Sequence, residues 1–185
     1  MERSDTVEIQ ATLAGDATAY KRLVEQYQQE IARRMWRFTR DRRQLEELVQ
    51  DVFVDAYMSL KSYRGTAPFA NWLNRIATRV GYRFWKRRRR TTNQAVALQD
   101  WDAFVARDEG IVESHEAAEF LHSLLAQLPP RDRLVLTLLY LEELSVAEAA
   151  ERSGWSQSMV KVQAHRARKK LKAILEKSGK TAIVE

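Results

Sequence analysis

Residues 145–172 read SVAEAAERSGWSQSMVKVQAHRARKKLK, and this stretch carries the clearest signals of fold in the chain. Ser145 and Glu148 have the spacing of a capping box, in which each side chain bonds the backbone amide of the other residue at the start of a helix. Gly154 can end that short helix, and Ser156 can cap a second, longer helix. The stretch therefore predicts a short helix, a tight glycine turn and a long helix, which is the pattern of a helix-turn-helix.

The long helix after Ser156 should bury one side and expose basic residues on the other. The residues expected to face inward are Met159, Val160, Ala164, Ala167, Leu171 and Ile174. The basic residues around the rest of the helix are Lys161, His165, Arg166, Arg168, Lys169, Lys170 and Lys172. A helix of this kind fits the major groove of duplex DNA, where it reads base edges and neutralises phosphates. A solvated basic helix without a ligand is the alternative, and the capped short helix and glycine turn favour DNA binding.

Apolar residues elsewhere also recur at helical spacing, and six glycines and three prolines in 185 residues leave few tight turns. The protein is therefore predicted to be all-α. Three helices are expected in the first half, after Gly15-Asp16, near Leu45 and after Pro68. The second should bury Leu45, Leu48, Val49, Val52, Phe53, Ala56, Tyr57 and Leu60. The third should bury Phe69, Trp72, Leu73, Ile76, Ala77, Val80 and Phe84. Two leucine-rich helices separated by Pro129-Pro130 come before the helix-turn-helix.

The net charge of +6 is unevenly distributed along the chain. Residues 1–90 hold 19 basic and 11 acidic side chains, residues 91–130 hold 1 and 7, and residues 131–185 hold 11 and 7. Two basic regions therefore flank an acidic middle. Basic regions favour an anionic partner, with nucleic acid as the first candidate and an acidic membrane surface as the second.

The acidic middle also lacks a sustained helical period, which predicts a flexible linker between two small helical domains. We expect a helical bundle over residues 1–90, the linker over 91–115, a helix-turn-helix domain over 116–178 and a tail over 179–185. The chain has no cysteine, which excludes disulfides, Cys-ligated zinc and a thiol nucleophile. No apolar segment has the length of a signal core or a membrane span, so we expect a cytoplasmic protein without membrane insertion.

A second cationic segment, residues 79–90, reads RVGYRFWKRRRR and holds seven positive charges, no acid and three aromatic residues. Basic and aromatic residues together are typical of single-stranded nucleic-acid binding, in which bases stack on the rings. Alternatively, Phe84 and Trp85 belong to the core, and Lys86 to Arg90 form a helix end that favours cations. Contact between the basic side chains and phosphate is expected whether or not the aromatic residues stack on bases.

Four acids lie about a turn apart on the second predicted helix: Glu46, Glu47, Asp51 and Asp55. They form a carboxylate pair, a solvated face or an acidic protein-docking face. No neighbouring His, Gly-rich phosphate loop or second carboxylate pair accompanies them, so docking is the preferred functional interpretation. His115 and His122 could share a helix face, but no third ligand has suitable spacing. We therefore expect no metal site, no cofactor and no catalytic activity.

These features together resemble the extracytoplasmic-function (ECF) sigma factors of bacterial RNA polymerase over nearly the whole chain. The first matching block comprises Gly15-Asp16, Tyr20, Leu23-Val24, Tyr27, residues 47–53 (ELVQDVF), Tyr57, Phe69, Trp72-Leu73, Ile76-Ala77 and the arginine run. The second comprises Leu128-Pro129-Pro130-Arg131, residues 144–150 (LSVAEAA), Val160-Lys161 and residues 165–171 (HRARKKL). A helix-turn-helix alone would be weak support, whereas two blocks in order across an acidic linker are specific.

The resemblance implies a non-catalytic initiation factor that binds RNA polymerase core, through its beta-prime and beta subunits, and directs it to promoter DNA. The residues matching the segment that docks on the beta-prime clamp helices are Leu48, Gln50 and Asp51. Those matching the region that reads and melts the −10 element are Ser62, Tyr63, Arg64, Asn71, Arg75, Arg79, Arg83 and Lys86. Those matching the −35 reader are Lys161, Val162, His165 and Arg166, with Arg168 and Lys169 placed for phosphate. Control by an anti-sigma factor, and hence a response to stress or another signal, is also implied.

The chain departs from the family pattern at several of these positions. Arg79 and Arg83 stand where the family often has Asn and Asp, and Val162-Gln163 stands where it often has Ser-Arg. At these positions Val162 suits an apolar contact such as a thymine methyl. Lys161 and Arg166 could favour guanine. Two other classes remain open: a stand-alone regulator that uses only the helix-turn-helix, and a helical scaffold whose arginine run binds anionic lipid.

Overall fold

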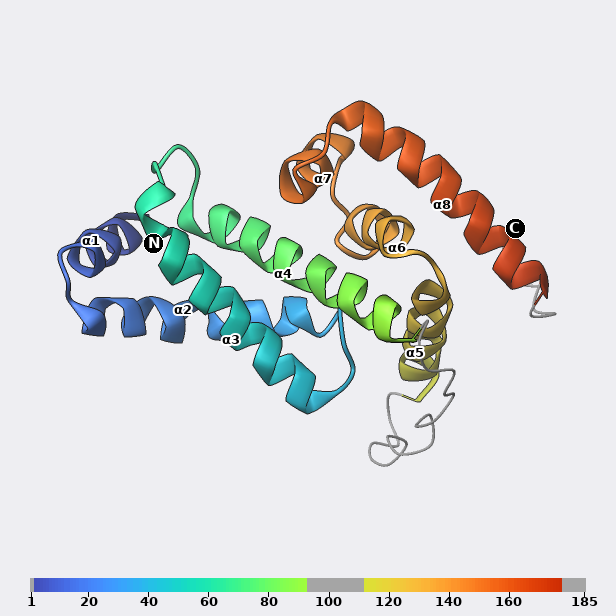
Figure 1. Cartoon of the computed structure of the whole chain (residues 1–185), viewed down its shortest axis with the longest axis horizontal. Helices are drawn as coiled ribbons and strands as arrows, with labels where there is room; N and C mark the ends of the chain where they lie inside the picture. The colour runs from blue at the N-terminus through green and yellow to red at the C-terminus, as the bar shows by residue number, and fades with distance from the viewer. Residues whose placement is uncertain (1, 93–111, 178–185) are drawn as a thin grey trace. The chain divides into compact units, whose positions relative to one another are not determined.

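The computed structural model describes residues 2–92 and 112–177. Its first part contains α1 (Glu2–Leu13), α2 (Ala17–Met35), α3 (Arg42–Ser59) and α4 (Phe69–Thr92) (Figure 1). Its second part contains α5 (Val112–Gln127), α6 (Pro130–Leu136), α7 (Val146–Ser153) and α8 (Gln157–Lys177). A 3-10 turn follows α3 at Leu60–Ser62, and a π turn follows α6 at Thr137–Leu141. No strand occurs in the described residues, so the predicted all-α class is confirmed.

The chain divides into two compact units, as the two-domain prediction required. The first holds α1, α2, α3 and α4 up to Phe84, and the second holds α5, α6, α8 and most of α7. Most of the predicted linker at 91–115 and all of the tail at 179–185 lie outside the described residues. Among the helices that are described, none has both the length and the apolar character needed to cross a membrane.

Helix α2 begins where the sequence predicted, because Gly15 and Asp16 act as a pair. Gly15 has a φ of 104°, a left-handed conformation that suits glycine, and Asp16 caps α2 by accepting a hydrogen bond from the Thr18 amide at 2.8 Å. This amide holds the pKa of the Asp16 carboxyl below its usual range. The end of α1 and the start of α2 are therefore set by local chemistry.

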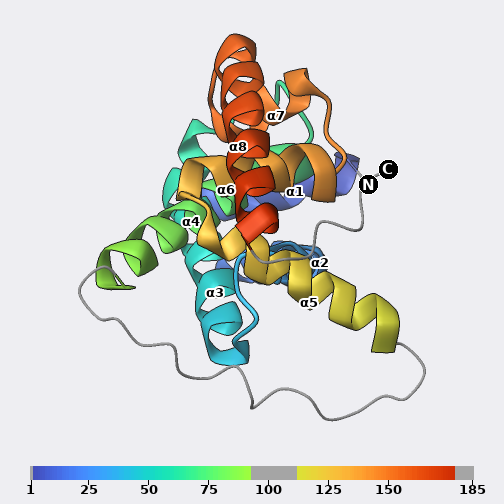
Figure 2. The ribbon, with the colours of Figure 1, turned by 90° about the vertical axis from the view of Figure 1, so that its right-hand side faces the viewer.

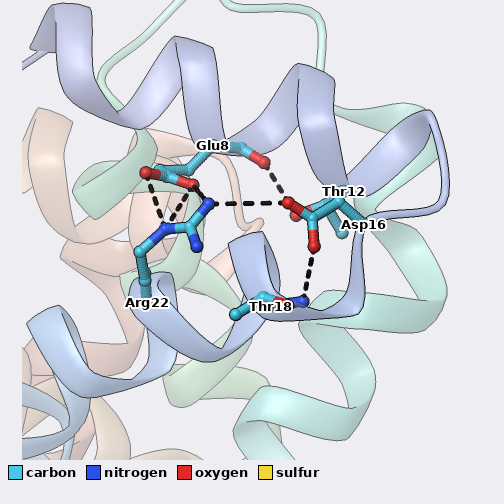
Figure 3. Close-up of polar contacts among 5 residues, drawn as sticks. All are labelled: Glu8, Thr12, Asp16, Thr18 and Arg22. Carbon is cyan, nitrogen blue, oxygen red and sulfur yellow. Dashed lines mark hydrogen bonds and ion pairs between the residues drawn. The ribbon is translucent and has the colours of Figure 1, made fainter.

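Polar side chains fasten α1 to α2 (Figure 3). The Arg22 guanidinium donates to both carboxylate oxygens of Glu8, with a shortest distance of 2.7 Å, and also lies 3.6 Å from Asp16. Asp5 is buried and accepts a hydrogen bond from the Tyr27 hydroxyl at 2.6 Å. Burial, and then this hydrogen bond to Asp5, raise the pKa of Tyr27. The N-terminal helix thus belongs to the first unit.

The core of the first unit is a helical bundle in which α2, α3 and α4 each contribute an apolar stripe. Its buried apolar residues include Leu23, Ile31, Met35, Phe38, Leu48, Val52, Phe53, Ala56, Leu60, Phe69, Leu73, Ile76, Ala77 and Val80. Tyr57 is a correction to the predicted stripe, since 52% of it is exposed. Ala56 takes the buried position beside it, and the Tyr57 ring packs edge-on against Tyr20 with ring centroids 4.9 Å apart.

The buried face of α4 includes residues that the apolar pattern did not mark, and one of them is a glycine. Gly81 is buried, and a Cβ at that position would clash with the ring of Phe38. Glycine therefore permits a close approach of α4 to Phe38 in the turn after α2. Trp72 and Phe84, predicted to face inward, are half-buried.

The second unit is built around α6 and α8, which pack against each other (Figure 2). The helix-turn-helix is capped as predicted: the Ser145 amide donates to the Glu148 carboxylate at 2.8 Å, and the Glu148 amide donates to the Ser145 hydroxyl at 3.2 Å. Gly154 ends α7 with a φ of 75°. Ser156 then caps α8 by accepting a hydrogen bond from the Met159 amide at 3.2 Å.

Candidate nucleic-acid interface

Helix α4 presents one continuous polar and basic face to solvent. Five of the residues predicted to read the −10 element lie on it, all exposed: Asn71, Arg75, Arg79, Arg83 and Lys86. Successive members are four, four, four and three residues apart, so they follow one side of the helix. The face opposite them is buried in the bundle, which fixes the direction in which the five side chains point.

The loop before α4 carries the other three predicted −10 residues, and aromatic contacts hold it in place. Ser62 and Arg64 are exposed, whereas Tyr63 is half-buried. The Tyr63 hydroxyl donates to the Ala67 carbonyl at 2.7 Å, and its ring lies 5.4 Å from that of Trp72, centroid to centroid. The loop therefore closes on itself and on the first turn of α4, and it leaves Ser62 and Arg64 exposed.

One basic residue of the α4 face is already engaged within the unit. The Arg83 guanidinium donates to the Asp55 carboxylate of α3 at 2.6 Å. Both side chains are more than a third exposed, so solvent screens the pair and its contribution to stability is small, about 0–1 kcal/mol. The pair matters for binding, because the Asp55 carboxylate competes with any approaching anion for the Arg83 guanidinium.

The end of α4 carries the arginine run, and all four side chains from Arg87 to Arg90 are exposed. Arg89 and Arg90 occupy the last turn, where the partial negative charge of the helix terminus favours cations. These side chains are accessible to phosphate. Trp85 is 4% exposed, so it belongs to the core, as the alternative interpretation expected. Tyr82 and Phe84 are half-buried, and their stacking role stays a prediction.

Helix α8 exposes all six residues predicted to act on the −35 element. They are Lys161, Val162, His165, Arg166, Arg168 and Lys169. Val162 is 51% exposed, so its side chain is accessible to a partner. The opposite side of the helix is buried through Val160, Ala164 and Ala167.

Three polar contacts that the sequence did not reveal hold α8 to the rest of its unit. Asp132 of α6 is 1% exposed and accepts hydrogen bonds from the Gln163 amide and, at 2.6 Å, from the Lys170 ammonium. The Arg168 guanidinium donates to the Tyr140 hydroxyl at 3.0 Å. Arg168 and Lys170 of α8 thus bond to residues on other elements of their unit. The seven-residue spacing of Gln163 and Lys170 was visible in the sequence, but their shared acceptor lies 31 and 38 residues away.

The predicted docking face on α3 is only partly as expected. Gln50 and Asp51 are exposed, but Leu48 is 2% exposed. Leu48 lies on the apolar stripe of α3, so its side chain packs in the core, and its assignment to a partner contact is corrected. Val54 and Met58, which are 60% and 78% exposed, were missed. They lie off the buried stripe, and that departure from helical period was the available signal.

The second unit also shows what one of the histidines does. The ring of His122 lies 3.2 Å from a guanidinium nitrogen of Arg133, which joins α5 to α6. The side chain of His115 lies outside the described residues. Over the described part of the chain, His, Asp and Glu residues form no group of three that could hold a metal ion.

Known proteins match both halves of the chain. Sigma-70 region 2 matches residues 23–91, and sigma-70 region 4 matches residues 120–171. The RNA polymerase sigma factor YlaC of Bacillus subtilis is 32% identical over 162 residues, covering 84% of this chain and 91% of the relative. The ECF RNA polymerase sigma factor SigE of Mycolicibacterium smegmatis is 31% identical over 176 residues, covering 91% of this chain and 67% of the relative.

Solved structures support the same fold. The structure of CnrH in complex with the cytosolic domain of CnrY is similar with a TM-score of 0.58 at 24% identity, covering 94% of this chain and 97% of that one. The sigma factor RpoE of Bartonella quintana, solved with the anti-sigma factor NepR, is similar with a TM-score of 0.55 at 18% identity, covering 85% and 96%. The chain belongs to the ECF sigma factors of the sigma-70 family.

Proposed function

We propose that this chain binds core RNA polymerase through α3 and directs it to promoters with two recognition elements. In this proposal, α4 and the 62–67 loop read and melt the −10 element, and α8 reads the −35 element. Sigma factors are non-catalytic transcription factors, so the polymerase supplies the chemistry. The observation that carries the proposal is the pair of helices, α4 and α8, each with one buried side and one exposed polar and basic side.

The assignment of individual roles follows from exposure and chemistry. Lys161 and Arg166 can donate to guanine acceptors in the major groove, and Val162 can contact a thymine methyl. Arg168 and Lys169 suit phosphates, as do the arginines at the end of α4. Exposed Gln50 and Asp51 would contact the beta-prime clamp helices. These roles separate base reading from backbone positioning.

Control by an anti-sigma factor is part of the same proposal. RpoE of Bartonella quintana was solved together with an anti-sigma factor, and CnrH with the cytosolic domain of CnrY. The fold shared with these proteins supports a comparable inhibitor for this chain. Such an inhibitor would make initiation responsive to stress or to another signal.

The decisive experiment is transcription by core polymerase on a library of genomic fragments, with the start sites read by sequencing. Addition of the chain should create start sites that share two upstream sequence elements at a constant spacing. Initiation no different from that of core alone would contradict the proposal. Tight binding to duplex DNA without polymerase, combined with no initiation, would favour a stand-alone regulator instead.

Variants of this assay test the individual surfaces. Asp51→Arg should reduce core binding, measured by competition, while leaving thermal unfolding unchanged, and an unaltered core affinity would contradict the docking assignment. Lys161→Ala and Arg166→Ala should each cost about 1–3 kcal/mol of discrimination between promoter and altered sequences. Lys172→Ala is the matched control, because it removes one charge from the same helix further from its N-terminus. An equal loss on every sequence would identify Lys161 and Arg166 as phosphate contacts.

A further inference from the structure

The fully buried side chains of α8 are small. They are Val160, Ala164 and Ala167, whereas the larger Met159, Leu171 and Ile174 are half-buried. Small buried side chains interlock less than large ones, so they constrain the rotation of the helix less. Base reading, however, requires side chains to be held within about 0.5 Å and 10–20° of their working geometry. Polar contacts can add to the constraint that apolar packing places on α8.

Asp132 provides two attachment points for this purpose. One carboxylate oxygen accepts from the Gln163 amide, and the other accepts from the Lys170 ammonium at 2.6 Å. The two donors are seven residues apart, which is about two turns or 10 Å along the helix axis. Because both reach the same carboxylate, a slide of α8 along its axis would break one bond, and a rotation would break both.

The carboxylate itself is firmly placed. Asp132 lies in the first turn of α6, and the three residues from Leu134 to Leu136 are buried. Proline occupies the first position of α6, which suits a helix start. The attachment therefore transmits the position of a packed helix to α8.

Stability alone is a weak explanation for this arrangement. Removing a carboxylate from water costs several kcal/mol, and buried ion pairs often stabilise a fold no better than apolar residues of similar size. What such pairs can supply is a single register between two elements. On α8, rotation by 100° per residue places Gln163 and Lys170 on the side away from Lys161 and His165, with Arg166 next to them. The attachment can thus orient Lys161 and His165 from the opposite side of the helix and Arg166 from an adjacent position.

We propose that Asp132 is a positioning residue for promoter recognition, which fixes the rotation and axial position of α8 through Gln163 and Lys170. The inference rests on the proposed function of α8 as the −35 reader. It assigns part of the sequence preference to a residue that does not touch DNA.

The test uses holoenzyme assembled from the full chain and core polymerase. Its probes are a promoter fragment recovered from the transcription assay and the same fragment with a scrambled −35 element. The measured quantity is the ratio of the two affinities. Asp132→Asn and Lys170→Met should lower this ratio at least tenfold, and Lys170→Arg should keep it within about twofold of the wild type.

Lys172→Met is the matched control, because it removes an equal charge from the same helix and its ion pair joins Lys172 to Glu176 of α8 itself. This control should weaken binding to both fragments alike and leave the ratio unchanged. If Lys170→Met behaves like Lys172→Met, the positioning role is wrong. Lys170 is 51% exposed, so Lys170→Met decides the question even if Asp132→Asn fails to fold.

The outcomes also separate this inference from the function on which it rests. A wild-type holoenzyme without preference between the two fragments would overturn both. A wild-type preference that Asp132→Asn and Lys170→Met retain would overturn the inference alone. Thermal unfolding of each variant shows whether a reduced preference accompanies a folded protein, as the positioning role requires.

Discussion

Helices α4 and α8 are both proposed to contact promoter DNA, but the protein holds them in place by different interactions. Helix α4 is buried through Leu73, Ile76 and Val80, and Gly81 brings it against the ring of Phe38. Helix α8 fully buries only the small residues Val160, Ala164 and Ala167, and it is also attached by the carboxylate of Asp132. The position of α4 thus depends on the shape of a large apolar core, whereas the position of α8 depends on hydrogen bonds and charge.

This difference determines what a substitution should do in each unit. A closely packed core has no room for a larger side chain, so a small increase in side-chain volume beneath α4 should reduce the stability of the first unit. A polar attachment can be broken while the apolar contact remains, so a change beneath α8 should act mainly on recognition. Pairing within the unit occurs on both helices, because Arg83 of α4 bonds to Asp55, and Arg168 and Lys170 of α8 bond to Tyr140 and Asp132.

The largest effect is expected from replacing the four arginines 87–90 by glutamine, which removes the charge that extends α4 beyond its packed part. Promoter affinity of the holoenzyme should fall roughly tenfold or more at low salt. The slope of log affinity against log salt should decrease by about 0.7–0.9 for each phosphate that the variant no longer neutralises. Titration over a range of salt concentrations measures both quantities.

A matched control replaces Arg42 and Arg43 by glutamine, since these lie on α3 and pair with Glu46 and Glu47 at 3.5 and 3.4 Å. The control should leave the salt slope unchanged. An unchanged slope in the quadruple variant would show that the arginine run does not contact phosphate.

The next largest effect concerns the packing beneath α4. Gly81→Ala gains about 1 kcal/mol of helix propensity. The added methyl group meets the buried ring of Phe38, and overpacking of this kind costs about 1–3 kcal/mol or more. We expect the cost of overpacking to exceed the gain in helix propensity, so the free energy of unfolding measured in urea should fall. Arg79→Ala, exposed on the same helix, should change it by less than about 0.5 kcal/mol. A more stable Gly81→Ala variant would mean that the Phe38 ring moves aside freely.

The comparison also shows which features were predictable from sequence. The caps at Asp16, Ser145 and Ser156 were predicted because each depends on residues within three positions. The exposed faces of α4 and α8 followed from helical period. The attachment at Asp132 was not predictable, because it joins residues far apart in sequence whose types occur commonly on surfaces. Leu48 was assigned to a partner by resemblance, although the same period placed it in the core.

A gain in stability is expected from relieving backbone strain just before the helix-turn-helix. Glu143 has a φ of 52°, which costs a residue with a Cβ about 1–2 kcal/mol. Glu143→Gly removes that strain but adds the conformational entropy of glycine to the unfolded chain, so the net gain should be about 0.5–1 kcal/mol. Glu143→Ala keeps the strain and should show no comparable gain in urea unfolding. Equal behaviour of the two variants would contradict the argument.

The smallest effect tests whether the Asp55–Arg83 ion pair weakens the attraction of α4 for phosphate. Asp55→Asn removes the carboxylate that lies 2.6 Å from Arg83, so phosphate no longer competes with it. An exposed pair contributes about 0.2–1 kcal/mol, which predicts a promoter affinity up to about fivefold higher at low salt. The gain should disappear at high salt, because screening weakens the interaction between exposed charges.

Glu46→Gln is the control, since it removes an equal charge from α3 where Glu46 pairs with Arg42. Equal gains from both variants would mean that general repulsion, and not the pairing of Arg83, sets the effect. A gain confined to Asp55→Asn would show that the exposed Asp55–Arg83 pair makes Arg83 less available to phosphate. On α8, by contrast, the carboxylate of Asp132 is buried and positions the helix.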